Sequence, residues 1–321
     1  ISDIMMPKMD GFALQSSLQT DKNTRIIPFI FLTARADEEA RQQGQRKGVD
    51  DYITKPFDMQ TLLSRVERLL ERVDMFQTQL DAQLGKDFSN RLLPDSAPEV
   101  DGYAVDFYSE ARRQGGGDLF DWTETDRGTY FLTIGDVMGK GLRAKFYAFS
   151  FLSYVRGTLN TLLEESTSPA TLMTKLNDML LNDEVLEDTF ATFLLLHWDP
   201  SAHTLTYANA GHCRPVLVSP DGPEVLEHSD LILGLEEEAE FSEVSLDLPP
   251  ETALMAYTDG LMEQHTQAGD MLGEEGVRDL TAEAYGHDAP LHTLLDDALA
   301  QSPSDQFEDD ILVVWLQRTG A

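Results

Sequence analysis

Four aspartates beyond residue 100 stand beside predicted strands, and glycines flank several of them. One aspartate at a strand end is usually a turn former, but four in matching contexts indicate a shared site. Carboxylate oxygens suit hard cations such as Mg²⁺ or Mn²⁺. Two such ions that share a carboxylate could hold a hydroxide and clamp a phosphoryl oxygen. The four residues are Asp118, Asp136, Asp259 and Asp309.

Asp136 lies in the glycine-rich stretch Gly135–Gly141, which reads G-D-V-M-G-K-G. The apolar run Tyr130–Ile134 before it predicts a buried strand, and the apolar spacing over Leu142–Val155 predicts a helix. We therefore expect Asp136 at the end of the strand, on a glycine-rich turn, where glycines let the backbone approach a ligand closely.

Three further residues of complementary chemistry lie near the N-terminus: Asp3, Thr33 and Lys55. Each follows a predicted strand, and the carboxyl edge of an open α/β sheet is where ligands bind. An aspartate there could accept a phosphoryl group as nucleophile, while a hydroxyl and an ammonium hold the phosphoryl oxygens. These residues predict a phosphoryl-accepting site.

Residues 1–57 have the pattern of half a doubly wound α/β domain. A strand ends at Asp3, apolar runs at Ile26–Leu32 and Asp51–Thr54 predict two more, and a polar helix is expected over Asp37–Lys47. Residue 1 is Ile rather than Met and the pattern opens inside a domain, so we expect the chain to be a fragment of a longer protein.

This segment resembles the second half of the receiver domain of two-component response regulators. The resemblance implies that Asp3 is the phosphoacceptor, Thr33 the switch hydroxyl and Tyr52 the switch aromatic. It makes Lys55 the phosphoryl-binding lysine before a cis proline, and it implies an upstream histidine kinase. The matching motifs are Met6-Pro7, Met9-Asp10-Gly11, Thr33-Ala34 and Lys55-Pro56.

Residues 58–93 predict a long helical linker. Their apolar positions alternate steps of three and four, which is the seam of a coiled coil, and a parallel homodimer is expected. The alternative is one amphipathic helix packed on its own domain. The seam residues are Met59, Leu62, Val66, Leu69, Val73, Phe76 and Leu80.

Residues 94–321 predict an α+β domain with mostly antiparallel sheets. Helices are expected over Leu142–Leu163, Pro169–Asp183, Gly276–Ala284 and Pro290–Gln301. Strands are expected over Tyr103–Tyr108, Thr129–Ile134, Ala191–Trp198, Thr204–Ala208, Pro215–Val218, Ala253–Tyr257 and Ile311–Leu316.

This domain resembles the SpoIIE-like branch of the metal-dependent (PPM-type) serine/threonine protein phosphatases, from about Leu92 to Leu316. The resemblance implies a β-sandwich flanked by helices, with the metals at one end. The motifs that carry it are Gly116-Gly117-Asp118, Gly135–Gly141, Asn209-Ala210-Gly211-His212, Tyr257-Thr258-Asp259-Gly260 and Asp309-Asp310.

By this resemblance Asp136 bridges two divalent cations, Mn²⁺ or Mg²⁺, and the backbone carbonyl of Val137 contacts one of them. Asp259 and Asp309 complete the other, and Asp118 holds metal or its waters. A hydroxide activated by the metals attacks phosphoserine or phosphothreonine in line, without a phosphoenzyme.

The chain departs from the family pattern at Met138, where some relatives place a histidine that could protonate the leaving group. Gly115 replaces the usual apolar residue before the first motif. Arg112 or Arg113 could contact phosphate, although a solvated surface arginine is the simpler interpretation. His212 is expected to be structural rather than a metal ligand.

The two resemblances together imply a response-regulator output phosphatase. Its substrate would be a phosphorylated anti-sigma-factor antagonist in a partner-switching pathway. The alternative is an inert phosphatase-like adaptor that binds a sigma factor or regulator under receiver control. The complete set of aspartates favours the enzyme.

The composition excludes several classes of binding partner and site. Lys and Arg total 24 against 57 Asp and Glu, a formal net charge of −33, which argues against nucleic acid and anionic membranes and favours a cationic partner. The single cysteine, Cys213, excludes an internal disulfide. No apolar stretch is long enough to span a membrane and no signal segment is present, so a cytoplasmic bacterial protein is expected.

Overall fold

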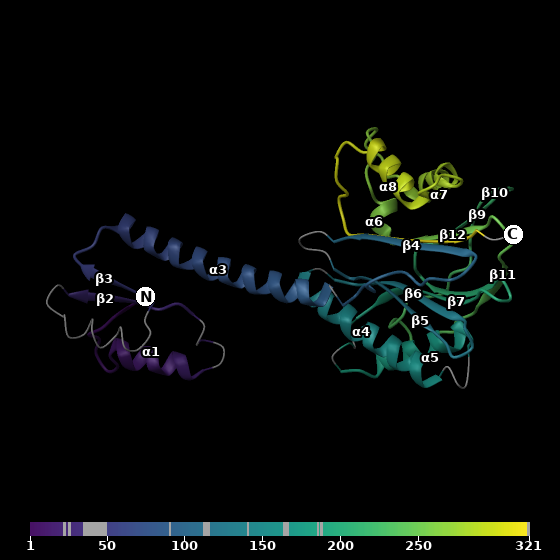
Figure 1. Cartoon of the computed structure of the whole chain (residues 1–321). Helices are drawn as coiled ribbons and strands as arrows, with labels where there is room; N and C mark the ends of the chain where they lie inside the picture. Colours follow the sequence, from purple (N-terminus) through teal and green to yellow (C-terminus); the bar gives the residue numbers. More distant parts are fainter. Residues whose placement is uncertain are drawn as a thin grey trace. The chain divides into compact units, whose positions relative to one another are not determined.

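The computed structural model describes residues 1–21, 24, 27–34, 50–89, 91–111, 116–139, 141–162, 167–184, 186 and 189–319 (Figure 1). Its contacts divide the chain into two compact units, residues 1–82 and residues 83–321. The helix expected over Asp37–Lys47 lies outside the described residues, as do Arg112, Arg113 and Gly115.

The first unit is built on a three-stranded parallel sheet, β1 (Ser2–Asp3), β2 (Ile30–Ala34) and β3 (Asp51–Lys55), in that order. This confirms the predicted parallel α/β half-domain. Strand β2 begins four residues later than expected. Pro28, which lacks a backbone N–H, precedes it and does not pair.

Two helices accompany this sheet: α1 (Gly11–Thr20) and α3 (Met59–Ser89). The carboxylate of Asp10 caps α1, because its Oδ1 accepts a hydrogen bond from the backbone N–H of Ala13 at 2.7 Å. The Met9-Asp10-Gly11 motif therefore has a local structural purpose, the start of α1, as well as its place in the family pattern.

Helix α3 is continuous over 31 residues, as the long linker helix was predicted to be. The amino-terminal part of its apolar seam has an intramolecular partner: Leu69 is buried with Ile30 and Ile53, and Leu62 and Val66 pack against the same cluster. This part of the seam belongs to the core of the receiver unit. Pairing of α3 with a second chain stays a prediction.

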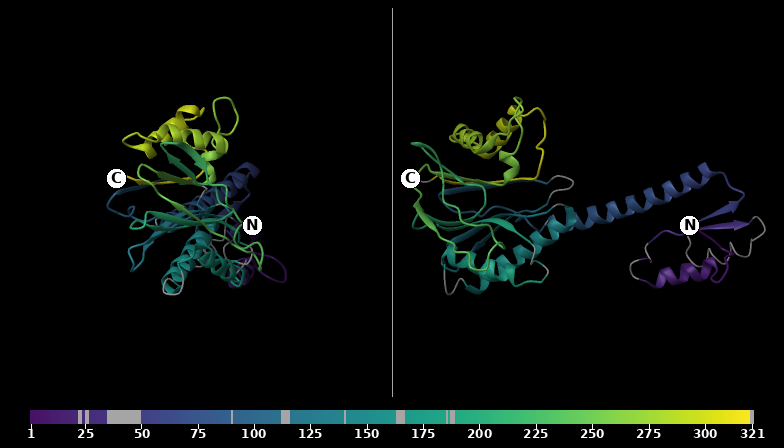
Figure 2. Two further views of the ribbon diagram at one scale, coloured as in Figure 1. Left: turned by 90° about the vertical axis from the view of Figure 1, so that its right-hand side faces the viewer. Right: turned by 180° about the vertical axis from the view of Figure 1, so that it is seen from behind.

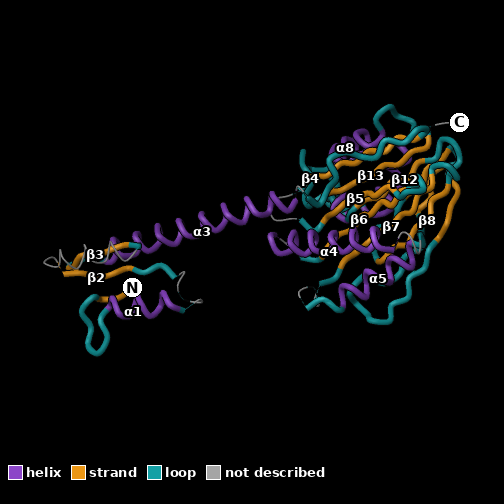
Figure 3. The backbone as a smooth tube through the Cα atoms, turned by 60° about the horizontal axis from the view of Figure 1, so that its bottom comes forward, coloured by secondary structure: helices purple, strands orange, loops and turns teal. Residues whose placement is uncertain are grey.

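The second unit is a sandwich of two five-stranded sheets whose paired strands are all antiparallel (Figure 3). One sheet has the order β10-β9-β12-β13-β4 and the other β11-β8-β7-β6-β5. The strands are β4 (Tyr103–Glu110), β5 (Asp118–Glu124), β6 (Tyr130–Val137), β7 (Ala191–Asp199), β8 (Thr204–Ala210), β9 (Val216–Ser219), β10 (Gly222–Val225), β11 (Val244–Asp247), β12 (Ala253–Tyr257) and β13 (Ile311–Arg318).

Helices cover both outer faces of the sandwich (Figures 1 and 2). Helices α4 (Gly141–Leu162) and α5 (Pro169–Leu181) pack on one sheet, and α6 (Asp259–Met262), α7 (Gly273–Ala284) and α8 (Pro290–Gln301) on the other. The four predicted helices and the flanked sandwich are confirmed, and the short α6 was not predicted.

The central strands are buried on both faces, which explains their apolar sequences. In β6, Leu132 and Ile134 face the other sheet while Phe131 faces the helices. Three strands that sequence did not predict, β5, β10 and β11, are more polar, and all three lie at sheet edges. The burial of β11 alternates along the strand, as at a half-exposed edge.

Candidate active site

The hairpin of β5 and β6 places two of the four predicted aspartates side by side. Asp118, the first residue of β5, pairs directly with Asp136 across the ladder. Asp136 also pairs with Thr192 of β7. Asp136 therefore lies at the end of a strand, as expected, but within the ladder of β6 rather than on the turn. Because β6 has a partner on each side, its ladder continues through Asp136 to Val137.

Gly117 brings the start of β5 against these acidic residues. A Cβ on Gly117 would lie 2.3 Å from Oδ1 of Asp136 and 2.3 Å from the carbonyl oxygen of Val137. No real side chain tolerates contacts that short. Glycine is thus required here for close approach, and the Val137 carbonyl and Asp136 carboxylate lie on the same small surface.

The other two aspartates come from the second sheet. Asp259 is the first residue of α6, just after β12, and Asp309 lies two residues before β13. Strands β12 and β13 are antiparallel neighbours, so the end of one adjoins the start of the other. The first turn of α6 packs tightly here, since a Cβ on Gly260 would meet the carbonyl oxygen of Asp310 at 1.9 Å.

The aspartates of the two sheets lie close enough to shift one another's pKa values. Burial, followed by Asp259, Asp310, Asp309 and Glu263, raises the pKa of Asp136 to about 7. Burial and then the Asp136 charge raise the pKa of Asp118 well above its usual range. All four predicted residues thus gather at one end of the sandwich.

The pKa of Asp259 is raised as well, by burial and then by Asp309. No protein cation is among the main causes of the shifts at Asp118, Asp136 or Asp259. Buried carboxylates need a compensating positive charge, which bound cations would supply.

The donor set fits hard divalent cations, because it is buried, strongly anionic and made only of oxygen ligands. The side chains nevertheless do not form a closed cage: within the described ranges, no three His, Cys, Asp or Glu residues are grouped tightly enough to hold an ion. The strand register and the mutual pKa shifts of the carboxyl groups nevertheless place these residues in one acidic cluster.

Two further acidic residues belong to this cluster: Asp310, which was part of a sequence motif but had no predicted role, and Glu263, which was not singled out from sequence. Asp310 is 9% exposed and Glu263 lies one helical turn after Asp259, and both raise the pKa of Asp136. The i, i+4 spacing of Asp259 and Glu263 was the available signal, but it required knowing that a helix begins at Asp259.

His212 lies in the core, as its predicted structural role requires. Its Nδ1 is 2.9 Å from the Thr192 hydroxyl, and its backbone N–H donates to Oδ1 of Asn209 at 2.8 Å. Burial lowers the pKa of His212 to about 4, so the ring is neutral at physiological pH. Met138, in contrast, is 52% exposed.

In the receiver unit, two of the predicted residues are in contact. Lys55 Nζ lies 2.5 Å from Oδ1 of Asp3, and both side chains are partly exposed at the carboxyl ends of β3 and β1. The Thr33 hydroxyl is buried in the neighbouring β2. The Tyr52 ring stacks on Phe31, and the Lys55–Pro56 bond is cis, as predicted.

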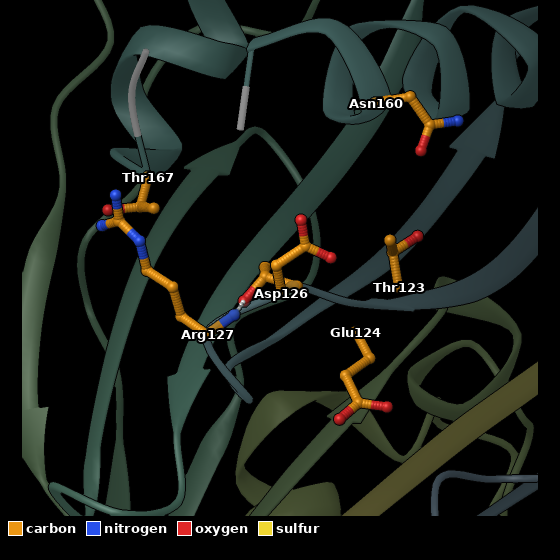
Figure 4. Close-up of a pocket in the computed structure, with 7 residues that line it drawn as sticks. Thr123, Glu124, Asp126, Arg127, Asn160 and Thr167 are labelled. Carbon is orange, nitrogen blue, oxygen red and sulfur yellow. Dashed lines mark hydrogen bonds between the residues drawn. The ribbon is translucent and has the colours of Figure 1, made fainter. Parts of the chain in front are cut away.

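A polar cavity of about 400 Å³ lies at the other end of β5, by the turn into β6 (Figure 4). None of the predicted site residues lines it. Its lining residues are Thr123, Glu124, Thr125, Asp126, Arg127, Asn160 and Thr167.

Comparison with known proteins agrees with both halves of this structure. Residues 1–67 match the response regulator receiver domain, and residues 126–319 match the Stage II sporulation protein E (SpoIIE) family. RpaA of Synechocystis sp., a DNA-binding transcriptional regulator, is 46% identical over 72 residues, which are 22% of this chain and 30% of that protein. The chain thus spans about a third of the length of this curated relative.

Solved structures resemble the sandwich. The RsbU and RsbW domains of Rv1364c from Mycobacterium tuberculosis give a TM-score of 0.57 at 23% identity, covering 70% of this chain and 63% of that one. RsbX in complex with magnesium gives a TM-score of 0.51 at 15% identity, and the match covers 68% of this chain and 97% of that one. At these identities the likeness establishes the fold.

None of the described helices combines the length and the apolar character needed to cross a membrane. The family match covers more than half of the chain and coincides with the sandwich and its acidic end. The chain belongs to the SpoIIE family and joins a response regulator receiver domain to a SpoIIE-type PP2C phosphatase domain.

Proposed function

We propose that this chain is a receiver-controlled, metal-dependent phosphatase that hydrolyses phosphoserine or phosphothreonine on a protein. The observation that carries the proposal is the buried aspartate cluster at one end of the sandwich, which has no protein counter-cation among its main pKa determinants. A site of this kind attracts divalent cations, and through them the oxygens of a phosphoryl group.

Asp136, central to the cluster, is the residue we assign as a ligand shared by two ions, Mn²⁺ or Mg²⁺. Asp259 and Asp309, together with Asp118 and the Val137 carbonyl from the hairpin, would be the other ligands. When bound, two such ions activate water and stabilise the charge of the transferring phosphoryl group. The magnesium complex of RsbX supports this choice of cation.

The chain's own residues supply the framework. The paired ladders of β5, β6 and β7 hold Asp118 and Asp136 on rigid backbone, which limits reorganisation during the reaction. Met138 cannot donate a proton, and its exposure indicates that the adjoining turn faces solvent. We infer that the leaving serine or threonine oxygen takes its proton from water.

The receiver unit provides control in this proposal. Asp3 accepts a phosphoryl group from a histidine kinase, and Lys55, already beside it, holds a phosphoryl oxygen. Thr33 and Tyr52 respond to that charge. By likeness to RsbU-type domains, the substrate is an anti-sigma-factor antagonist of a partner-switching pathway. The apolar seam of α3 pairs two chains into a homodimer.

The test is an assay of phosphoserine-protein and p-nitrophenyl phosphate hydrolysis with Mn²⁺, and again with a chelator. We expect metal-dependent turnover, and a loss of at least about a hundredfold in Asp136→Asn, because a shared ligand is removed. Asp247→Asn, on exposed edge strand β11, should be unaffected. A wild-type protein inert with Mn²⁺ or Mg²⁺ would favour the adaptor.

A further inference from the structure

Thr258 precedes helix α6 but does not cap it. Threonine at this position normally accepts a hydrogen bond from an amide in the first turn. Here the side chain makes no capping bond, although the backbone is extended as a cap requires. The residue is completely buried, so its hydroxyl must find another partner inside the protein.

That partner is a carboxylate of the acidic cluster. The Thr258 hydroxyl donates to Oδ2 of Asp118 at 2.7 Å, and it accepts a hydrogen bond from the backbone N–H of Leu312 at 3.0 Å. A hydroxyl has one proton to donate and lone pairs to accept with. Both capacities are used, and the bond to Asp118 is of the stronger, charge-assisted kind when that carboxyl group is ionised.

The hydroxyl links the two sheets at the acidic end. Asp118 begins β5 in one sheet, while Leu312 belongs to β13 in the other. The backbone N–H of Thr258 also donates to the carbonyl of Leu312 at 3.0 Å. Thr258 is therefore fixed to β13 through its backbone and its hydroxyl, and the nearest acceptor of the hydroxyl proton is Asp118, at 2.7 Å against 3.5 Å for the Leu312 carbonyl oxygen.

We propose that Thr258 is a positioning residue of the cation site. Its hydroxyl holds Oδ2 of Asp118 and so fixes the carboxylate in one orientation, with Oδ1 left for a cation. Because Thr258 precedes Asp259, it sets two acidic residues from different sheets relative to each other. The inference rests on the proposed function in taking a divalent cation as the ligand.

The chemistry of threonine suits this task. Its branched Cβ restricts the first side-chain torsion, so the hydroxyl has few alternative directions. Thr258→Val keeps the shape but removes both bonds, leaving the Leu312 amide unsatisfied and Asp118 without this donor. Thr258→Ser keeps the hydroxyl. The pair separates loss of the hydrogen bonds from loss of packing.

The experiment titrates Mn²⁺ by calorimetry into the full chain after chelator treatment. Outer-shell partners of metal ligands typically contribute ten- to a hundredfold in affinity, so Thr258→Val should bind Mn²⁺ about tenfold or more weakly. Thr258→Ser should stay within about threefold of wild type. Thr281→Val, a buried threonine whose hydroxyl bonds only helix α7, is the matched control and should bind normally.

A double-mutant cycle with Asp118→Asn shows whether Thr258 acts through Asp118: the valine substitution should then add little in the Asp118→Asn background. Equal Mn²⁺ affinity in Thr258→Val and wild type, with lower thermal stability alone, would overturn the proposal. If the valine variant does not fold, Thr258→Ala gives the same comparison.

A wild type that binds Mn²⁺ without hydrolysing phosphoserine contradicts the proposed function and leaves this inference standing. A wild type that binds no Mn²⁺ contradicts both.

Discussion

The glycine beside Asp118 determines how closely the two strands of the acidic hairpin can approach. Replacing Gly117 with alanine would place a methyl group against the Asp136 carboxylate and the Val137 carbonyl. One or both must then move, and small displacements in a catalytic site are costly. We expect Gly117→Ala to lower kcat/KM for phosphoserine substrates by about tenfold or more.

The matched control is Gly157→Ala. Gly157 lies in helix α4, and a Cβ there would meet no heavy atom within 4 Å. Alanine in a helix is favoured over glycine by up to about 1 kcal/mol, so this variant should keep full activity and gain slight stability. Steady-state kinetics and thermal unfolding of both variants decide the matter, and unchanged kinetics in Gly117→Ala would show that the contact is relieved elsewhere.

At this scale the sequence was sufficient to single out the four aspartates, because each stands next to an apolar strand and a recognisable motif, whereas their roles as cation ligands stay a prediction. It was insufficient for Thr258 and Glu263. Their contribution depends on which strands lie together and on a four-residue helix, neither of which leaves a periodic pattern. Sequence also placed Asp136 on a turn, since glycine at position 135 suggested the end of a strand that continues through its two partners.

Among the elements, buried strands were predictable and most edge strands were not. Strands such as β6, β7 and β13 are apolar on both faces and read as continuous runs. Strand β5 carries Asp, Trp, Thr and Glu along its length because one end enters the acidic site and the strand lies at the sheet margin. The polar residues at the acidic end and the exposure of an edge strand both interrupt the apolar run by which a buried strand is recognised in sequence.

The apolar seam of helix α3 is used in part within its own chain. Leu62, Val66 and Leu69 already pack on the receiver sheet, so they cannot also form a free coiled-coil seam. The apolar spacing continues at Val73, Phe76 and Leu80. We expect a parallel dimer through this later part, and Leu80→Glu should dissociate it, because two buried charges would face each other.

Sedimentation velocity or light scattering of the full chain measures the change directly, as a fall from dimer to monomer mass. Gln77→Glu, in the same part of α3 but outside the seam, is the control and should leave the mass unchanged. A Leu80→Glu protein with the mass of the wild type would instead support a helix that packs only within its own chain.

For the whole molecule, tryptophan offers a selective probe of one unit. The three tryptophans of the chain, Trp122, Trp198 and Trp315, all lie within residues 83–321. Intrinsic tryptophan fluorescence therefore reports unfolding of the phosphatase unit without interference from the receiver unit. This matters because a chain of two units need not unfold in one step.

This probe tests the consequence of burying His212. In the unfolded chain its pKa is about 6.5, whereas burial lowers the pKa in the folded protein to about 4. The folded state thus excludes the proton. The stability contributed by the neutral ring is complete above about pH 6.5 and is lost as the pH falls towards 4, by roughly 3 kcal/mol.

The comparison with His212→Gln isolates this effect, because the carboxylates titrate in both proteins and cancel in the difference. We expect the free-energy advantage of the wild type over the glutamine variant, measured by urea unfolding, to shrink by roughly 3 kcal/mol between pH 7 and pH 4. Glutamine cannot take up the proton, so its own curve lacks this slope. If the two curves run parallel through this range, the imidazole gains a proton as easily in the fold as in water, and the buried ring beside Thr192 is not held neutral.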